Sequence, residues 1–308
     1  MRALVTGAAG FVGTHLLSHL IESGDEVIAC FAPGQECKLK VPSLKFDITN
    51  YNDCIDAISK SEVDVIYHLA GIAFVPDAEN DFAKVLSINV GGTQNIMRAA
   101  HLAGRNATVV LASSAEVYGK VASTNIPVSE KHPIRPANNY SLTKAMAEMV
   151  VNRYNDLGTV KGVILRPYNH IGASQDKQFV ASSFAYQLAL ISKKKAPAII
   201  KVGNLSPQRD FSDVRDIVRA YRLASMKGSG MFILGRGQPT AIQEILSTLI
   251  DISGLTVKIE QDPERTRPAE VPVLYADITK AKSELGWQPK YTLRESLEEV
   301  YSYWLSRS

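Results

Sequence analysis

The stretch Thr6-Gly7-Ala8-Ala9-Gly10-Phe11-Val12-Gly13 decides the fold, because it stands where a buried strand turns into a helix. Ala3-Leu4-Val5 before it is an apolar run typical of a buried strand, and apolar residues recur with helical spacing over 11–21 after it. Glycines at such a turn let the backbone bend sharply and approach a pyrophosphate, to which the helix N-terminus offers free N–H groups. A tight strand–helix connection is the structural alternative, and the spacing G-x-x-G-x-x-G differs from the usual G-x-G-x-x-G. The predicted dinucleotide-binding residues of this turn are Gly7, Gly10, Phe11, Val12 and Gly13.

Strand and helix patterns continue to alternate through the first half of the chain. Such alternation requires right-handed crossovers and predicts an α/β fold with a Rossmann-type doubly wound parallel sheet. After 168 the rhythm breaks into Pro-, Gly- and Asn-rich segments between shorter helices at 214–226 and 242–253. We expect a dinucleotide-binding domain over 1–168, to which later segments return, and a smaller C-terminal α+β lobe over 169–308 that binds the substrate. The further strands expected in the first half cover 26–31, 44–46, 63–69, 108–112 and 160–165, and its long helices cover 82–103 and 138–157.

Composition and charge exclude several classes of function. Hydrophobic residues make up 45% of the 308 residues and charged residues 21%, as in ordinary globular proteins. A net charge of +3 is too small to indicate nucleic-acid binding, and no apolar stretch approaches the roughly 20 residues that span a bilayer. The three cysteines form no metal spacing and cannot all pair, which is typical of a reducing cytoplasm. We therefore expect a soluble cytoplasmic protein without a metal site and without a nucleic-acid or membrane partner.

The residues that end the second strand distinguish the two nicotinamide dinucleotides. An acidic side chain there accepts hydrogen bonds from the ribose 2′-OH and repels a 2′-phosphate. Cys30-Phe31-Ala32 offers neither an acid nor an arginine, while Lys38 and Lys40 follow in a loop, as phosphate ligands or as solvated surface lysines. The sequence favours NADPH over NADH and leaves both open.

Tyr140-Ser-Leu-Thr-Lys144 lies at the start of a helical segment, and its i, i+4 spacing places the phenol and the ammonium on one helix face. A free tyrosine has a pKa near ~10, and a neighbouring ammonium stabilises its phenolate and lowers that pKa. Tyr140 is thus a candidate proton donor or acceptor for a substrate oxygen, and Lys144 is a candidate ligand of the nicotinamide ribose. Packing and a solvated lysine are the structural alternative.

The fifth strand ends in Ala112-Ser113-Ser114, at the edge of the sheet where ligands bind in folds of this type. There the hydroxyl of Ser114 is expected to hydrogen-bond the same substrate oxygen as Tyr140, or else to cap its own turn. The predicted catalytic residues are Ser114, Tyr140 and Lys144.

With these motifs in place, the chain resembles, nearly end to end, the extended short-chain dehydrogenases/reductases that act on nucleotide sugars. The resemblance implies that Asp47 and Ile48 lie along the adenine and that Leu69, Ala70 and Gly71 lie along the dinucleotide. A helix N-cap and a buried strand end are the alternatives for these two segments. The segments that carry the resemblance are TGAAGFVG (6–13), Asp47-Ile48, His68-Leu69-Ala70-Gly71, Asn89-Val90-Gly91-Gly92-Thr93, SSAEVYG (113–119), YSLTK (140–144) and Arg166-Pro167-Tyr168-Asn169.

Segments 169–172, 200–205, 209–216 and 267–272 resemble GDP-6-deoxy-D-mannose reductases and, less tightly, GDP-mannose 4,6-dehydratases. The former reduce the 4-keto group of GDP-4-dehydro-6-deoxy-D-mannose to give GDP-D-rhamnose. Arginine side chains bind phosphate oxygens bidentately, so Arg209 and Arg267 are candidate ligands of the substrate phosphates. A surface salt bridge is the alternative for each arginine. The substrate-binding residues that follow are Glu116, Asn169, Lys201, Arg209, Arg267 and Glu270.

The resemblance implies reduction of a 4-keto-6-deoxy nucleotide sugar, in which Tyr140 protonates the developing alkoxide and Ser114 helps to hold it. A 4,6-dehydratase is an alternative, because Glu116 stands where those enzymes carry a glutamate, but Ala73 and Ala115 replace their usual polar residues. A 4-epimerase and a non-catalytic NAD(P)-binding regulatory protein are further alternatives. The resemblance also implies a homodimer through the helices that carry Asn89 and Tyr140.

Overall fold

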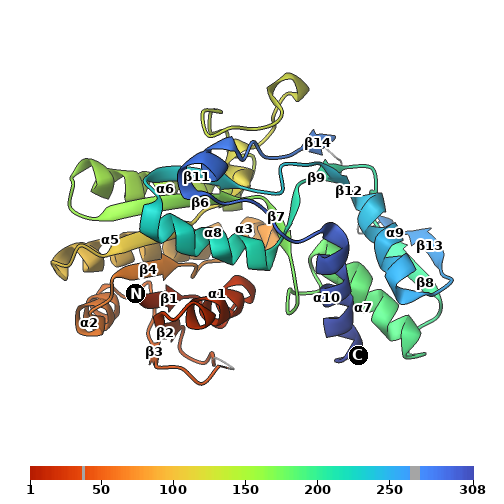
Figure 1. The fold of residues 1–308 in the computed structure, drawn as a ribbon, viewed down its shortest axis with the longest axis horizontal. Helices are drawn as coiled ribbons and strands as arrows, with labels where there is room; N and C mark the ends of the chain where they lie inside the picture. The colour runs from red at the N-terminus through yellow and green to blue at the C-terminus, as the bar shows by residue number, and fades with distance from the viewer. Residues whose placement is uncertain (37–38, 264–270) are drawn as a thin grey trace.

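A computed structural model describes residues 1–36, 39–263 and 271–308. Its centre is a seven-stranded sheet in the order β11-β6-β5-β4-β1-β2-β3 (Figure 1), in which every pair of neighbours is parallel. The strands are β1 (Arg2–Thr6), β2 (Glu26–Phe31), β3 (Ser43–Lys45), β4 (Val65–His68), β5 (Thr108–Ala112), β6 (Lys161–Pro167) and β11 (Gly230–Leu234). The predicted doubly wound parallel sheet is confirmed.

Helices cover both faces of this sheet because successive strand residues point to opposite sides. On β1, Val5 joins the core beneath α1 (Phe11–Glu22) and α8 (Val214–Lys227), whereas Leu4 joins the core beneath α2 (Tyr51–Ser61) and its neighbours. The neighbours on that second face are α5 (Gly92–Leu102) and α6 (Asn139–Asp156).

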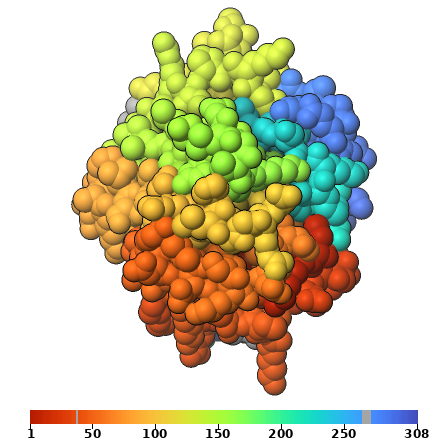
Figure 2. Space-filling view, turned by 90° about the vertical axis from the view of Figure 1, so that its left-hand side faces the viewer, coloured from red at the N-terminus to blue at the C-terminus, as the bar shows by residue number. Residues whose placement is uncertain are grey.

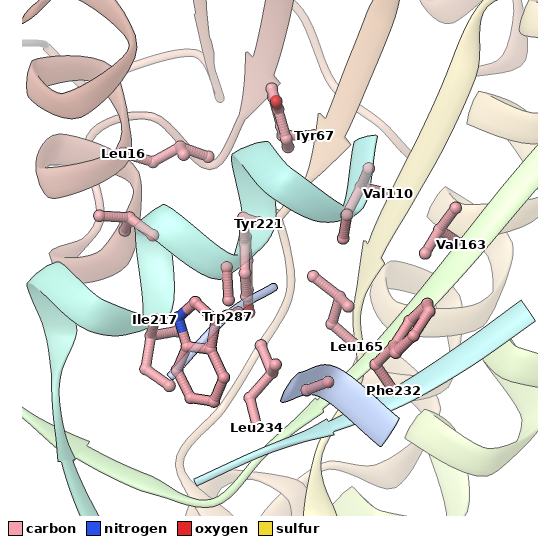
Figure 3. Close-up of a cluster of buried hydrophobic side chains, with 14 of the residues drawn as sticks. Leu16, Tyr67, Val110, Val163, Leu165, Ile217, Tyr221, Phe232, Leu234 and Trp287 are labelled. Carbon is pink, nitrogen blue, oxygen red and sulfur yellow. The ribbon is translucent and has the colours of Figure 1, made fainter. Parts of the chain in front are cut away.

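The first of these cores is tightly interlocked. Figure 3 shows Tyr221 of α8 between Leu16 of α1 and the sheet residues Val110 and Leu165, and Ile217 of the same helix belongs to the same cluster. Burial of each such side chain is worth about 1.5–3 kcal/mol relative to exposure. The core therefore fixes the helix that follows the glycine turn.

The chain order places a crevice at one edge of the sheet. From β3 the chain returns to the other side of β1 to form β4, so the strand order reverses between β1 and β4. The carboxyl ends of strands beside such a reversal leave room for a ligand. The turn at 6–13 and the loop after β4 both lie at this place.

The helix expected over 82–103 is present in extent but is not uniform. It consists of α4 (Phe82–Leu86), a π-helical turn (Ser87–Gly91) and α5, and a short helix α3 (Val75–Asn80) precedes it. π-turns inside helices are rare and are often found at functional sites. Asn89 lies in this turn with its side chain buried.

The second lobe packs α7 (Val180–Ser192), α9 (Ile242–Ser253) and α10 (Leu293–Leu305) around a core of their own (Figure 1). The boundary at 168 stays a prediction; α8 and β11, which follow it in sequence, belong to the layers of the main sheet. The lobe's small sheets pair β7 (Asn169–Ile171) with β10 (Phe211–Asp213), β8 (Ile199–Val202) with β13 (Lys258–Gln261), and β9 (Gln208–Arg209) with β12 (Thr240–Ala241) and β14 (Val273–Leu274). Short turns of helix complete the chain at η2 (Ala115–Tyr118), η3 (Ser123–Asn125) and η5 (Ala281–Leu285).

The side of the molecule at which α5 ends is built mainly from the first half of the chain. Figure 2 shows orange to green residues across this side, with cyan and blue residues along one edge. Among the described residues, no helix combines the length and the apolar character needed to cross a membrane.

Candidate active site

The glycine turn is shaped by contact with the loop that follows β4. Gly7 has φ +68°, and a Cβ there would lie 2.8 Å from the backbone nitrogen of Ala70. At Gly13 a Cβ would lie 2.2 Å from the carbonyl oxygen of Gly7. Helix α1 begins after Gly10 without a capping side chain, so its first N–H groups are available to an anion. The residues present fit the pyrophosphate of a nicotinamide dinucleotide.

A buried chain of hydrogen bonds holds the β4 loop. The Ala70 N–H donates to Thr6 Oγ1 (3.2 Å), which lies 2.9 Å from His68 Nδ1. On the other side, His68 Nε2 lies 3.2 Å from Thr93 Oγ1, which donates to the Asn89 carbonyl. Because the Thr93 hydroxyl donates to the Asn89 carbonyl, its oxygen accepts from His68, which places a proton on Nε2. Burial and then Lys144 lower the pKa of His68 to about 3, so the ring is neutral.

Asn89 joins the same loop to the helix that carries Tyr140. Its Oδ1 accepts from the Ile72 N–H (2.8 Å), and its Nδ2 donates to the Ile72 carbonyl and to Thr143 Oγ1 (3.1 and 3.0 Å). Thr143 Oγ1 in turn donates to the carbonyl of Tyr140. The dinucleotide loop and the start of α6 are therefore fixed relative to one another.

Tyr140, Ser114 and Lys144 meet at the carboxyl ends of β4 and β5. The Ser114 hydroxyl lies close enough to the Tyr140 phenol to affect its ionisation. Ser114 Oγ accepts from the Glu116 N–H (3.1 Å) and so caps its own turn, while its contact with a substrate oxygen stays a prediction. Lys144 Nζ lies 5.9 Å from the centre of the Tyr140 ring and donates to the Ala112 carbonyl (2.8 Å). A Cβ on Gly71 would lie 3.6 Å from the same Nζ, which places the ammonium beside the loop after β4.

The structure corrects one expectation about this constellation. Burial raises the pKa of Tyr140 to about 12, against the lowering effect of the Ser114 hydrogen bond. The expected net lowering of the Tyr140 pKa is not observed, because the loss of hydration destabilises the phenolate more strongly than its polar neighbours stabilise it. Burial also lowers the pKa of Lys144 to about 8, although Glu148 acts to raise it. At neutral pH the phenol carries its proton and the lysine is mostly charged.

A buried ion pair lies behind Lys144. Glu148, one turn further along α6, accepts hydrogen bonds from Ser113 and from Nε and Nη2 of Arg166. Arg166 also donates to the Tyr118 hydroxyl (2.7 Å). Such bidentate pairs are geometrically specific, so this one fixes the end of β6 against α6, and the Ser113 bond attaches the end of β5 to the same carboxylate.

A cavity of about 990 Å³ lies between the loop after β4 and the second lobe. Ser114, Tyr140 and Lys144 are not among the described residues that line it. Val75 lines it and packs against the small apolar cluster that contains Tyr140, while Arg209 lines it and is close enough to Glu116 to affect its ionisation. Burial raises the pKa of Glu116, and Arg209 and a hydrogen bond with Asn138 lower it. The cavity is lined by Ala73, Phe74, Val75, Pro76, Lys177, Gln178, Phe179, Val180, Ser183, Phe184, Tyr186, Gln187, Lys201, Gly203, Asn204, Leu205, Pro207, Arg209, Ile242 and Asp262.

The structure places only some of the other predicted site residues at the cavity. Lys201 is exposed on the cavity wall, but Asn169 is exposed at the start of β7 and is not among the described residues that line the cavity. Asp47 accepts from the N–H and hydroxyl of Thr49, and Ile48 packs where a Cβ on Gly92 would collide with it. The remaining predictions, for Arg267, Glu270 and Lys38, lie outside the described residues.

A second cavity, of about 700 Å³, lies at the opposite, amino end of β2 and next to α2. None of the predicted site residues lines it, so it is separate from this chemistry. Asn89 and Glu148, by contrast, were not predicted as site residues and yet, with His68, hold the site together. A polar residue within an otherwise helical or strand pattern was the available signal for each of them.

A parallel sheet with a glycine-rich first turn, and a tyrosine, lysine and serine at its carboxyl edge, defines a short-chain dehydrogenase/reductase that uses a nicotinamide dinucleotide. A family model described as GDP-mannose 4,6 dehydratase matches residues 4–300. The chain belongs to that family of nucleotide-sugar enzymes, and the predicted resemblance is confirmed.

Known relatives cover the whole chain. GDP-6-deoxy-D-mannose reductase of Pseudomonas aeruginosa is 34% identical over 99% of this chain and 98% of its own length. The structure of RMD from the same organism complexed with NADPH has a TM-score of 0.86 at 30% identity, over 100% of this chain and 99% of that one. A UDP-glucose 4-epimerase of Thermus thermophilus in complex with NAD has a TM-score of 0.88 at 26% identity, over 99% of both chains. The chain is accordingly an NAD(P)-dependent nucleotide-sugar enzyme.

Proposed function

We propose that this enzyme reduces the 4-keto group of a 4-keto-6-deoxy nucleotide sugar, namely GDP-4-dehydro-6-deoxy-D-mannose, to give GDP-D-rhamnose. The observation that carries the proposal is the buried phenol of Tyr140 beside Lys144, whose ammonium lies 5.9 Å from the centre of the ring and is held at the carboxyl end of β5. Reduction of a ketone requires a proton donor at the oxygen, and a phenol with a pKa of about 12 is one at neutral pH. The similarity to GDP-6-deoxy-D-mannose reductase over the full chain supports the choice of sugar.

The bound reduced nicotinamide would supply a hydride to C4 of the sugar. Tyr140 donates its proton to the oxygen at C4 as negative charge develops there, and the Ser114 hydroxyl donates a hydrogen bond to the same oxygen. Lys144 stabilises the phenolate that remains, until a proton from solvent restores the phenol. The loop held by His68 and Asn89 keeps the dinucleotide side of the site in register with α6.

Arg209 and Lys201 are proposed to bind the diphosphate of the substrate. Both line the cavity, and Nη1 of Arg209 donates to the carbonyl of Gln208, which leaves the other edge of its guanidinium for a ligand. Glu116 is proposed to accept from a sugar hydroxyl. NADPH is the proposed cofactor, because positions 30–32 carry no acid that would repel a 2′-phosphate.

A 4,6-dehydratase is a second candidate, and Glu116 favours it. Desolvation raises the pKa of the Glu116 carboxyl, which interacts with Tyr140, and such a group suits the acid–base chemistry at C5 and C6. The neighbouring Ala73 and Ala115 supply no second polar group for that elimination. A dehydratase regenerates its cofactor within each turnover, whereas a reductase consumes one NADPH for each product.

The test is incubation with NADPH and GDP-4-dehydro-6-deoxy-D-mannose, with nicotinamide absorbance and product NMR as readouts. We expect one NADPH to be oxidised for each GDP-D-rhamnose formed, and a higher kcat/KM with NADPH than with NADH. The Tyr140→Phe variant should lose at least about a hundredfold in kcat while it keeps its NADPH affinity. Turnover of GDP-mannose without net NADPH consumption would support the dehydratase instead, and near-normal kcat in Tyr140→Phe would contradict the role of the phenol.

A further inference from the structure

Two helices at the edge of the cavity begin with a phenylalanine where a polar capping residue is usual. Phe74 is the N-cap of α3 and Phe179 is the N-cap of α7, and neither helix start has a side-chain cap hydrogen bond. Helices α2, α6, α8 and α10 begin instead with capping side chains from Asn, Asp or Thr. An apolar N-cap costs helix stability. Helix α9 also begins at one, Ala241, so the role of the two phenylalanines follows from where their rings lie.

The two rings meet across the cavity from different lobes. Phe74 follows β4 in the first lobe and Phe179 lies in the second, and their ring centres are 6.1 Å apart at 74°, an edge-to-face contact. Both line the cavity of about 990 Å³, and Phe179 keeps 38% of its surface exposed. The pair is thus an apolar surface that folding leaves open to a ligand.

This apolar surface continues to the reacting centre. Val75, next to Phe74, lines the cavity and packs against the apolar cluster of Ala78, Val85 and Tyr140. The segment Ile72-Ala73-Phe74-Val75-Pro76 contains no polar side chain, whereas Lys201 and Arg209 make other parts of the wall cationic. A bound sugar whose C4 oxygen meets Tyr140 therefore has an apolar wall beside that carbon.

A 4-keto-6-deoxyhexose carries one apolar substituent, the C6 methyl group, and C6 is attached to C5, directly next to C4. We propose that Phe74 and Phe179, with Val75, form the subsite for this methyl group and select 6-deoxy sugars over sugars with a C6 hydroxyl. A hydroxymethyl group in this subsite would find no hydrogen-bond partner in segment 72–76, and an unpaired buried hydroxyl weakens binding. The inference rests on the proposed function and adds the specificity residues to it.

The subsite is tested with GDP-6-deoxy-D-mannose, which is the GDP-D-rhamnose named above, and GDP-D-mannose, because the two ligands differ only at C6. Their dissociation constants are to be measured by calorimetry on the complex with NADP⁺, for the wild type and for Phe74→Ser, Phe179→Ser and Phe74→Leu. We expect the wild type to favour the 6-deoxy ligand by about tenfold or more, as apolar pockets discriminate single groups. Each serine variant should reduce that ratio to about threefold or less, while Phe74→Leu, which stays apolar, should keep most of it.

NADPH affinity and thermal denaturation of each variant report whether the fold is intact. Equal wild-type affinity for the two ligands, or an equal loss for both ligands in the serine variants, overturns the methyl subsite; the second result would mean that the rings contact the base. Consumption of NADPH on the keto sugar is a separate readout. Turnover of the keto sugar without a preference at C6 in binding would contradict only the methyl subsite. A preference at C6 without NADPH consumption would contradict the proposed reaction and support the subsite.

Discussion

Gly7→Ala is the substitution whose cost the structure defines most directly. Gly7 combines a left-handed backbone, with φ +68°, and a close approach to the loop after β4, where a Cβ would lie 2.8 Å from the Ala70 nitrogen and 2.9 Å from the Leu69 carbonyl carbon. Gly24, just beyond the other end of α1, has φ +78° and no atom within 4 Å of its Cβ position. An alanine would be strained by the left-handed backbone at both positions, but only at Gly7 would its Cβ also collide with neighbouring atoms.

The two costs can therefore be separated. An L-residue in the left-handed region costs about 1–2 kcal/mol, which is the full effect expected for Gly24→Ala. Overpacking against backbone that is held by β4 adds about 1–3 kcal/mol. Gly7→Ala should thus lower the free energy of unfolding by roughly 2–5 kcal/mol. Because the collision pushes Ala70 and Leu69 out of place, Gly7→Ala should also weaken NADPH binding, whereas Gly24→Ala should leave it unchanged.

Urea denaturation followed by tryptophan fluorescence gives the stability of each variant, and fluorescence titration gives its NADPH dissociation constant. A loss of stability in Gly7→Ala no larger than that in Gly24→Ala would refute the close packing of the turn on the β4 loop. Unchanged NADPH affinity in Gly7→Ala would refute the placement of the dinucleotide along that loop.

Three further predictions follow from buried groups and from the surface. The pKa of His68 is about 3 in the folded chain against an ordinary value of 6.5, so the stability that neutral His68 confers is complete above pH 6.5 and is lost as the pH falls toward 3. The free energy of unfolding of His68→Gln, measured by urea denaturation, should therefore depend less on pH between pH 7 and 5 than that of the wild type. An unchanged pH dependence would contradict the assignment of a neutral His68. Asn89→Ala leaves the buried N–H of Ile72 unpaired and should destabilise the fold by about 1–3 kcal/mol and raise the KM for NADPH, so normal values for both would remove its role. Met149 on α6 is 70% exposed, which suits the predicted homodimer through α5 and α6. Light scattering should then give twice 33.6 kDa for the wild type and a lower mass for Met149→Lys. A monomeric wild type would exclude the dimer.

The sequence determined those features that depend on neighbours along the chain. The turn at 6–13 requires glycine locally, and the period of apolar residues sets the helix at 242–253, which the structure places over Ile242–Ser253. The Tyr140–Lys144 spacing is also local, since any α-helix brings residues i and i+4 to one face. The resemblance along the whole chain also indicated the family to which the protein belongs.

The tertiary structure decided what depends on residues far apart in sequence. Periodicity predicted an even helix over 82–103, but Asn89 bonds to Ile72 and to Thr143 and lies in a π-turn within it. The pKa of Tyr140 is set by burial, and the ammonium one turn away, which was the local neighbour visible in the sequence, does not govern it. The pairing of Phe74 with Phe179 spans more than a hundred residues. Local backbone preference carries no information about such contacts, because they form only when folding brings segments that are distant in sequence together.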